Sequence, residues 1–393
     1  MADLGVMALL LGVALSAYCA IGVVIGEKMG RAALVVSARR ALYMMAVAAA
    51  VASGTLINAF VQNDFSIAYV ADHSNTLMDR AFVWVAFYAG NEGSLLYILL
   101  TLSVISVISV WFAPKRLARS MPWTIAILAI IQLFYFGVLA FVASPFELLD
   151  TVPVDGRGIN PLLTHPGMFS HPPLLMGGLI AITIPFAFVS GALIAGNYGD
   201  DWVDVARVSA IIGWGVLGTG MLLGAWWAYT ILGWGGYWAW DPIENVALMP
   251  WLVMTAFLHS IMVQKRRGMF RLWNVALLNI AFVLAQLGMF INRGGPVVSV
   301  HSFAASTLGA IFLSFMLASL VFAFALFLWR MPQLKSDRAM ESFVSREASF
   351  LINNFLFLAV MVVTLWGVLF PLFSDLARDV SVSVSAPYFD RVN

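Results

Sequence analysis

Charged residues are scarce in this sequence. Asp, Glu, Lys and Arg make up only 10% of its 393 residues, and 62% of the residues are hydrophobic. A soluble domain usually carries about 25% charged residues. The shortage excludes an ordinary soluble domain and predicts that most of the surface faces lipid. The formal net charge of +1 gives no sign of nucleic-acid binding.

Cysteine is almost absent as well. Cys19 has no second cysteine with which to form an internal disulfide, so the fold is predicted not to depend on redox state. The sequence also lacks the Cys/His spacing of a zinc site, a P-loop, a dinucleotide fingerprint and any arguable Ser-His-Asp arrangement. The first residues carry neither a basic segment nor a clear cleavage site, so we expect a retained first helix rather than a signal peptide.

Long apolar runs are abundant. A helix that crosses a membrane needs about 20 mostly apolar residues. The sequence therefore predicts an all-α polytopic membrane protein that forms a single transmembrane domain over residues 1–393. The ten predicted helices span about residues 4–26, 41–60, 94–113, 122–144, 174–196, 208–229, 246–264, 272–291, 303–329 and 349–372.

Lys and Arg are distributed unevenly between the two sides of this predicted bundle. Alternate connections, at 27–40, 114–121, 197–207, 265–271 and 330–348, hold 16 of the 21 Lys and Arg residues. Because cytoplasmic connections are enriched in Lys and Arg, this side is predicted to be cytoplasmic and both termini periplasmic. The outer connections are longer, which indicates that the protein works on the outer side.

Tryptophan is concentrated in one segment. Six of the 14 Trp residues fall within residues 226–251, more than an interfacial belt needs at two helix ends. The segment is predicted to form an aromatic platform for a large planar apolar ligand such as haem. Composition alone fits a thick interfacial belt equally well. The predicted platform residues are Trp226, Trp227, Trp234, Trp238 and Trp240, together with Asp241 and Glu244.

The run Asp241-Pro-Ile-Glu244 carries a helix-start signature. Asp is a favoured N-cap, Pro is favoured at the first helical position, and Glu three residues after the cap completes a capping box. We therefore expect Asp241 and Glu244 to open the helix at 246–264 and to anchor the platform, rather than to act directly in catalysis.

Two histidines are predicted to lie at the outer membrane edge, level with the Trp-rich segment. His171 precedes the helix at 174–196, and His301 stands at the entry to the helix at 303–329. Such a pair could supply both axial ligands of a haem iron. Either histidine alone is better explained as an ordinary interfacial residue. Arg293 is a weak candidate for a haem propionate partner, because few basic residues face outward.

His259 lies inside the predicted helix 246–264, in its cytoplasmic half. An ionisable residue at that depth is a functional candidate, here as a ligand of an intramembrane haem. The alternative is a buried neutral imidazole bonded to a neighbouring helix. No other histidine of the chain is predicted to lie at that depth, so a second iron ligand is missing.

The Trp-rich segment supports a resemblance. The run Trp234-Gly-Gly-Tyr-Trp-Ala-Trp-Asp-Pro-Ile-Glu-Asn245, followed by Met249-Pro-Trp-Leu252, resembles the WWD signature of haem-handling proteins. Its Asp-Pro-Ile-Glu-Asn continuation is most similar to the CcmF-type cytochrome c haem lyase subunit, rather than to the CcmC and CcsA types. Further similar stretches lie at residues 64–70, 90–96, 171–175, 298–301 and 387–389.

This resemblance implies a function in cytochrome c maturation at the bacterial inner membrane. It implies that His171 and His301 ligate haem on the periplasmic side and that His259 is one ligand of an intramembrane b-type haem. The family takes haem from a CcmE-type haem chaperone. With a CcmH-type thioreductase subunit, it attaches that haem to the Cys-x-x-Cys-His motif of apocytochrome c.

The sequence departs from the family pattern in two places. Family members continue past the position of Asn393, so the chain is expected to be truncated or to pair with a separate C-terminal half that supplies the second b-haem ligand. The family's usual His in the Gly-x-Glu-Gly stretch is Asn91 here. Three alternatives stay open: a haem transporter, a haem-binding scaffold without bond-forming activity, and a paralogue that serves one multihaem cytochrome.

Overall fold

The computed structural model describes residues 1–233, 235–294, 297, 299, 301, 307–336, 342, 344–378, 380 and 382–393. These residues form two compact units, Met1–Ile180 (unit 1) and Ala181–Asn393 (unit 2). Within the described ranges the regular structure is helical, apart from an isolated bridge between Ile67 and Leu148. The predicted all-α class is therefore confirmed.

Ten described helical segments are long and apolar enough to cross a membrane. They are Ala2–Lys28, Ala32–Val61, Asn91–Trp111, Met121–Phe141, Pro166–Ile194, Val203–Ile231, Pro242–Arg267, Arg271–Gly294, Leu308–Leu334 and Arg346–Arg378. Each coincides with one predicted span, so the protein is a multi-pass membrane protein. The second predicted span began too late, because α2 already starts at Ala32 and contains Arg39 and Arg40.

Unit 1 is built on four long helices, α1 (Ala2–Lys28), α2 (Ala32–Val61), α5 (Asn91–Trp111) and α6 (Met121–Phe141). Helix α1 packs against both α2 and α6. Glycine permits the close approach to α6, because a Cβ atom on Gly12 would lie 2.1 Å from the ring of Phe136. Small residues at helix contacts are the usual means of tight packing in membranes. The unit also contains the short helices α3 (Ala68–His73) and α4 (Val83–Phe87) and most of α7 (His171–Ala181).

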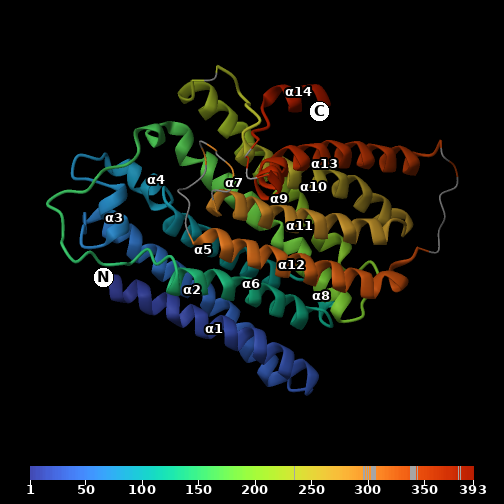
Figure 1. Ribbon diagram of the computed structural model, residues 1–393. Coiled ribbons are helices and arrows are strands. Elements are labelled where there is room, and N and C mark those ends of the chain that lie inside the picture. Colours follow the sequence, from blue (N-terminus) through green and yellow to red (C-terminus); the bar gives the residue numbers. More distant parts are fainter. Residues whose placement is uncertain are drawn as a thin grey trace. The chain divides into compact units, whose positions relative to one another are not determined.

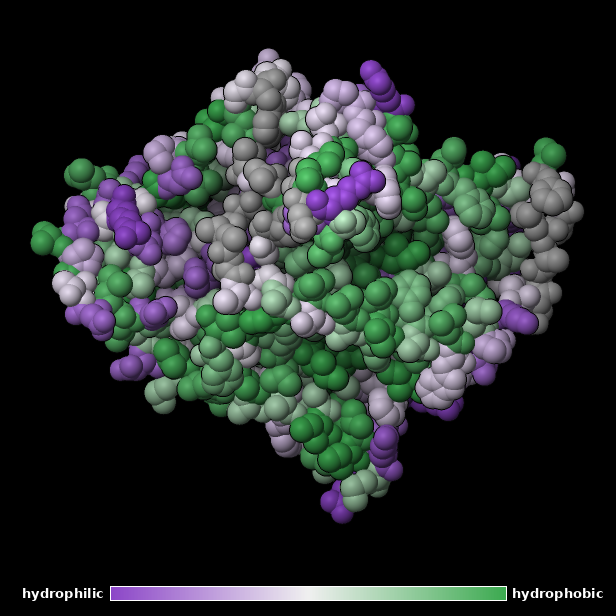
Figure 2. Space-filling view, in the orientation of Figure 1, coloured by the Kyte–Doolittle hydropathy of each residue, from purple (hydrophilic) through white to green (hydrophobic). Residues whose placement is uncertain are grey.

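Unit 2 is centred on α10 (Pro242–Arg267), which packs against α9 (Val203–Ile231), α11 (Arg271–Gly294) and α13 (Arg346–Arg378) (Figure 1). Helix α11 also contacts α8 (Thr183–Ile194) and α12 (Leu308–Arg330), and the terminal α14 (Ala386–Val392) packs against α13. Hydrophobic side chains cover α12 and α13 between their ends (Figure 2). Exposed examples are Val321, Leu328, Ile352, Leu356 and Val362. A continuous apolar surface of this kind suits contact with lipid.

The helix ends of unit 2 that carry Lys and Arg are joined by ion pairs. Arg271, at the start of α11, pairs with Asp200 at 2.9 Å, and Arg267, at the end of α10, pairs with Glu347 of α13 at 2.7 Å. Lys265 of α10 pairs with Asp204 of α9. Burial raises the pKa of the Asp200 carboxyl, but hydrogen bonds from Arg271 and Gln264 outweigh this and leave the pKa below its usual range. The basic ends therefore gather on one side of this unit.

The packing of α1 on α6 gives a first testable prediction. Gly12→Ala should lower the free energy of unfolding by about 1–3 kcal/mol, because the added methyl group meets the buried Phe136 ring. Thermal unfolding of the purified chain in detergent, followed by circular dichroism, measures this. Gly54→Ala on α2 is the matched control, since a Cβ atom there meets no atom within 4 Å. Equal stability of the two variants would contradict the proposed close packing.

Candidate functional site

The start of α10 is fixed by a capping box. The backbone N–H of Ile243 donates to Asp241 Oδ1 at 2.9 Å, and Pro242 occupies the first helical turn. Glu244 Oε2 accepts the N–H groups of Asp241, at 3.1 Å, and of Ala239, at 3.0 Å. The predicted helix start is confirmed, and an N-cap of this kind stabilises a helix by about 1 kcal/mol.

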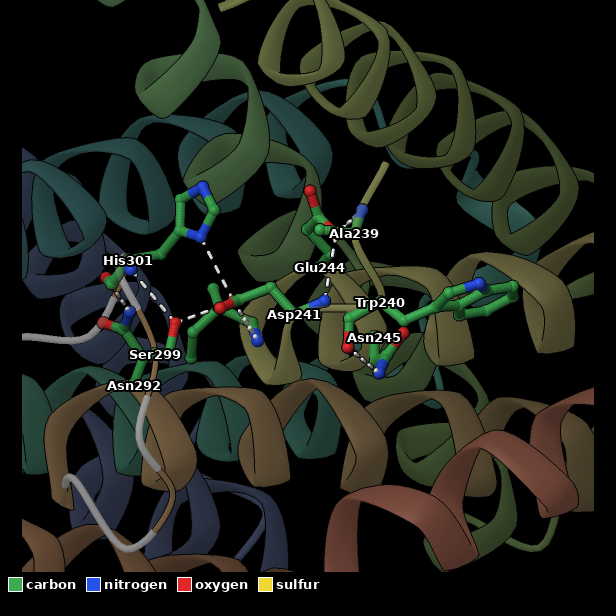
Figure 3. Close-up of polar contacts among 9 residues, drawn as sticks. Ala239, Trp240, Asp241, Glu244, Asn245, Asn292, Ser299 and His301 are labelled. Atoms are coloured by element: carbon green, nitrogen blue, oxygen red, sulfur yellow. Dashed lines mark hydrogen bonds and ion pairs between the residues drawn. The ribbon is translucent and has the colours of Figure 1, made fainter. Parts of the chain in front are cut away.

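The same Asp241 oxygen also holds His301, which the sequence did not indicate. His301 Nδ1 lies 3.1 Å from Asp241 Oδ1, and the Ser299 hydroxyl donates to that oxygen at 2.7 Å (Figure 3). Ser299 Oγ in turn accepts the backbone N–H of His301 at 3.0 Å. Asn292, near the end of α11, donates to the His301 carbonyl at 3.2 Å. Asp241 thus holds the imidazole of His301, and Ser299 and Asn292 hold its backbone.

This contact selects the chemistry of the His301 ring. A carboxylate oxygen accepts a hydrogen bond, so Nδ1 carries the proton in the neutral imidazole and Nε2 carries the lone pair. Nε2 points away from Asp241 (Figure 3). A carboxylate behind a histidine is the arrangement that orients metal-ligating imidazoles and raises their basicity.

The Asp241 carboxyl is deeply buried, with 9% of its side chain exposed. Burial raises its pKa, but the hydrogen bond and electrostatic interaction with His301 and the hydrogen bonds from Ser299 and Ile243 lower it more, so the pKa lies below its usual range. Asp241 is therefore ionised at neutral pH, in the form that caps α10 and accepts from His301.

The aromatic residues of the 226–251 segment lie at different depths. Trp227 is buried, and its ring centroid lies 5.5 Å from that of His301 at an interplanar angle of 61°. Trp226 is 41% exposed, and both residues belong to α9, which runs to Ile231. Trp238 and Trp240 meet edge to face at 89°, so these two rings do not share one plane. Trp234 lies outside the described residues.

Trp240 has an unusual backbone conformation. Its φ angle is +57°, in the left-handed region that bulky residues rarely adopt. Holding a residue there costs about 1–3 kcal/mol and requires support from its surroundings. Asn245 supplies part of that support by donating to the Trp240 carbonyl at 2.9 Å. The sequence indicated neither the left-handed conformation of Trp240 nor its hydrogen bond with Asn245.

His259 faces α13 from within α10. Its Nδ1 lies 2.9 Å from Asn353 Nδ2, and the rings of Phe350 and Phe357 lie 6.0 Å and 5.8 Å away between centroids. His259 thus contacts a neighbouring helix, and its role as a haem ligand stays a prediction. An amide contact also suits a ligand histidine, since its second ring nitrogen is normally held by a hydrogen bond.

His171 is the first residue of α7 and is 8% exposed. It belongs to unit 1 and His301 to unit 2, and their pairing stays a prediction. Arg293 was predicted to lie in a loop, but α11 continues to Gly294, and Arg293 is a buried helical residue with 1% exposure. A buried guanidinium requires polar or anionic partners. Its role toward a propionate also stays a prediction.

The fold and site thus define a multi-pass membrane protein with an oriented histidine beside a tryptophan-rich segment. Residues 88–295 match the cytochrome c assembly protein family, and the chain belongs to that family. It is 36% identical to the cytochrome c-type biogenesis protein CcmF of Haemophilus influenzae, over 100% of this chain and 60% of that protein. It is 33% identical to the cytochrome c-type biogenesis protein NrfE of the same organism, over 99% and 62%.

A solved structure, described as cytochrome c haem lyase CcmF, has the same fold. It superposes with a TM-score of 0.82 at 31% sequence identity, covering 100% of this chain and 58% of that one. The chain spans about 60% of the length of the curated CcmF relatives that it matches.

The double role of Asp241 gives a second prediction. Asp241→Ala should lower the free energy of unfolding by about 1–2 kcal/mol, because α10 loses its cap and His301 its anchor. Because the folded-state pKa of Asp241 is depressed, its contribution is complete above about pH 4, the unfolded value, and disappears as the pH falls through the folded value. The deficit should therefore be constant from pH 6 to 8 and shrink in acid.

Thermal unfolding of the variant and the wild type, measured from pH 8 down into the acid range, tests this prediction. Asp79→Ala is the control, because Asp79 caps only a short exposed turn through Ala81. A deficit for Asp241→Ala no larger than that of the control would contradict the anchoring role.

Proposed function

We propose that this chain binds haem beside its Trp-rich segment and takes part in its covalent attachment to apocytochrome c. The observation that carries the proposal is the Asp241–His301–Trp227 arrangement, an oriented imidazole next to a buried indole. A metal-ligating nitrogen and an apolar ring suit the iron and the porphyrin respectively. Membership of the cytochrome c assembly family supports it.

The residues of the chain fit haem as a substrate. Asp241 fixes the His301 tautomer and the direction of Nε2, which is the atom proposed to ligate the iron. Trp227 is buried and packs against that imidazole. Trp226, Trp238 and Trp240 are proposed to contact the ring, and Arg293 a propionate. Haem itself supplies the two vinyl groups across which the cysteine thiols of the apocytochrome add.

In this proposal the protein catalyses by positioning. No residue near His301 needs to transfer a proton to the vinyl carbon, since the substrate thiols bring their own. The enzyme holds the ring so that its vinyl edge meets the two cysteines, which replaces a bimolecular encounter by an oriented one. His171 is proposed as the second axial ligand.

We propose that the Trp-rich end faces the periplasm and the basic ends of the helices face the cytoplasm, in the bacterial inner membrane, because Lys and Arg favour the cytoplasmic side. The proposed partners are a CcmE-type haem chaperone, a CcmH-type subunit and apocytochrome c.

His259 is proposed as one ligand of a b-type haem within the membrane. For Nε2 to bind iron, Nδ1 must carry the proton, so the acceptor oxygen of the Asn353 amide must face it. A half turn of that amide achieves this without moving either helix. The second ligand is proposed to come from a C-terminal part outside residues 1–393.

Haem retention tests the outer site. His301→Ala should reduce bound haem at least about tenfold, because loss of a metal ligand typically exceeds the effect of losing its supporting partner. The measurement is the reduced optical spectrum with a pyridine haemochrome assay, for His301→Ala, His171→Ala and His259→Ala. His73→Ala is the control, since its ring packs on Tyr69 and His73 is not among the proposed haem ligands.

The outcomes separate the sites. Loss with His301 or His171 but not His259 supports an outer site. Loss with His259 alone would limit stable binding to the membrane interior. If the wild-type chain takes up no haem from a loaded chaperone, the proposal is wrong. Thioether formation on an apocytochrome, with and without the partners, distinguishes a lyase from a scaffold.

The amide beside His259 gives a fourth prediction. Asn353→Leu removes the second-nitrogen partner and should weaken haem binding at His259 by about 10–100-fold. Asn353→Asp retains an acceptor and should preserve binding. Haem titration in a His301→Ala background isolates this site. Identical affinities of the Leu and Asp variants would rule out an orienting role.

A further inference from the structure

Helix α14 contacts the Trp-rich segment directly. The ring of Phe389 stacks on the indole of Trp240, with centroids 5.2 Å apart and planes inclined by only 13°. The Trp240 indole N–H donates to Asp390 Oδ1 at 2.7 Å. One indole is therefore held both across its face and at its polar atom, by residues about 150 positions further along the chain.

This contact rests on a firm support. Phe389 is 2% exposed and is seated against Gly367 of α13, where a Cβ atom would lie 2.4 Å from its ring. The neighbouring Tyr388 hydroxyl donates to the Val363 carbonyl of α13 at 3.2 Å. Helix α14 is thus anchored to the C-terminal half of α13, and both elements belong to unit 2 (Figure 1).

The residue held in this way is the one with the left-handed backbone. The φ angle of Trp240 is +57°, and a bulky side chain keeps such a conformation only where its surroundings fix it. Asp241 follows Trp240 directly, so the Trp240 backbone sets the position of the carboxylate that holds His301. Trp238 also contacts the Trp240 ring, edge to face.

We propose that α14 is a positioning element of the haem site, in which Phe389 and Asp390 hold Trp240 in its left-handed conformation and thereby align Asp241 and His301. The expected change in haem affinity rests on the proposed function. The holding of Trp240 is independent of that function and can be measured separately.

The test compares four variants of the chain in detergent. Phe389→Ala removes the stacking ring, and Asp390→Leu removes the acceptor. Asp390→Asn keeps an acceptor oxygen without the charge, and Arg391→Gln changes an exposed neighbour on the same helix. Hydrogen–deuterium exchange of peptides that cover residues 235–245 reports on the Trp240 backbone. Titration with haemin reports on the site.

We expect the first two variants to exchange at least tenfold faster at residues 235–245, with unchanged exchange in the middle of α10 and α11, and to bind haemin at least tenfold more weakly. Asp390→Asn and Arg391→Gln should behave like the wild type. The unchanged exchange of α10 and α11 shows that the variants have folded.

Unchanged exchange at 235–245 in Phe389→Ala and Asp390→Leu overturns the inference, whatever the haemin affinity. Faster exchange with unaltered haemin affinity also overturns it, because Trp240 would then be held without aligning the site. If the wild type binds no haemin, the proposed function fails, and the exchange data alone decide whether α14 holds Trp240.

Discussion

One buried carboxylate connects the parts of the candidate site. Asp241 Oδ1 accepts from the first turn of α10, from Ser299 and from His301. A charged acceptor in a poorly solvated position makes stronger hydrogen bonds than a neutral one, and its own burial is compensated by those same donors. The start of a transmembrane helix and the direction of an imidazole therefore depend on a single group. Neither can shift without disturbing the other.

The rest of unit 2 keeps that group in place. At the basic ends of the helices, ion pairs join α10 to α9 and α13, and α11 to Asp200 in the connection before α9, although partly exposed pairs each contribute little. At the opposite end, the capping box, Asn245 and α14 surround Trp240 and Asp241. Most of the rigidity between the two ends comes from side-chain packing, because helices in lipid gain little from further burial of apolar surface.

The sequence predicted the ten spans well, because hydrophobic length is a local property. It also predicted the start of α10, since a capping box lies within four residues. It placed the start of α2 too late, because Arg39 interrupts the apolar run. In the structure Arg39 lies within α2 and donates a hydrogen bond to the Val110 carbonyl of α5. Arg293 was placed in a loop for the same reason, as a charge usually marks a helix end.

The contacts of the site could not be predicted in this way. Asp241 meets a histidine 60 positions away, and Trp240 meets Asp390, which is 150 positions away. The sequence does not indicate which of several polar residues at one helix end are close enough to bond. The left-handed Trp240 runs against local propensity and exists only because distant residues fix it. Asn353 beside His259 likewise depends on how α13 packs on α10.

The depressed pKa of Asp241 bears on the conditions under which such a site works. In the proposed orientation, which places the site on the outer face of the membrane, the site meets the acidity of the surroundings more directly than a cytoplasmic site would. A carboxylate that stays ionised below its usual range keeps the helix start and the histidine anchor intact as the medium acidifies. Because Asp241 stays ionised, the external pH can fall below neutral without loss of the hydrogen bonds that this carboxylate makes in the site.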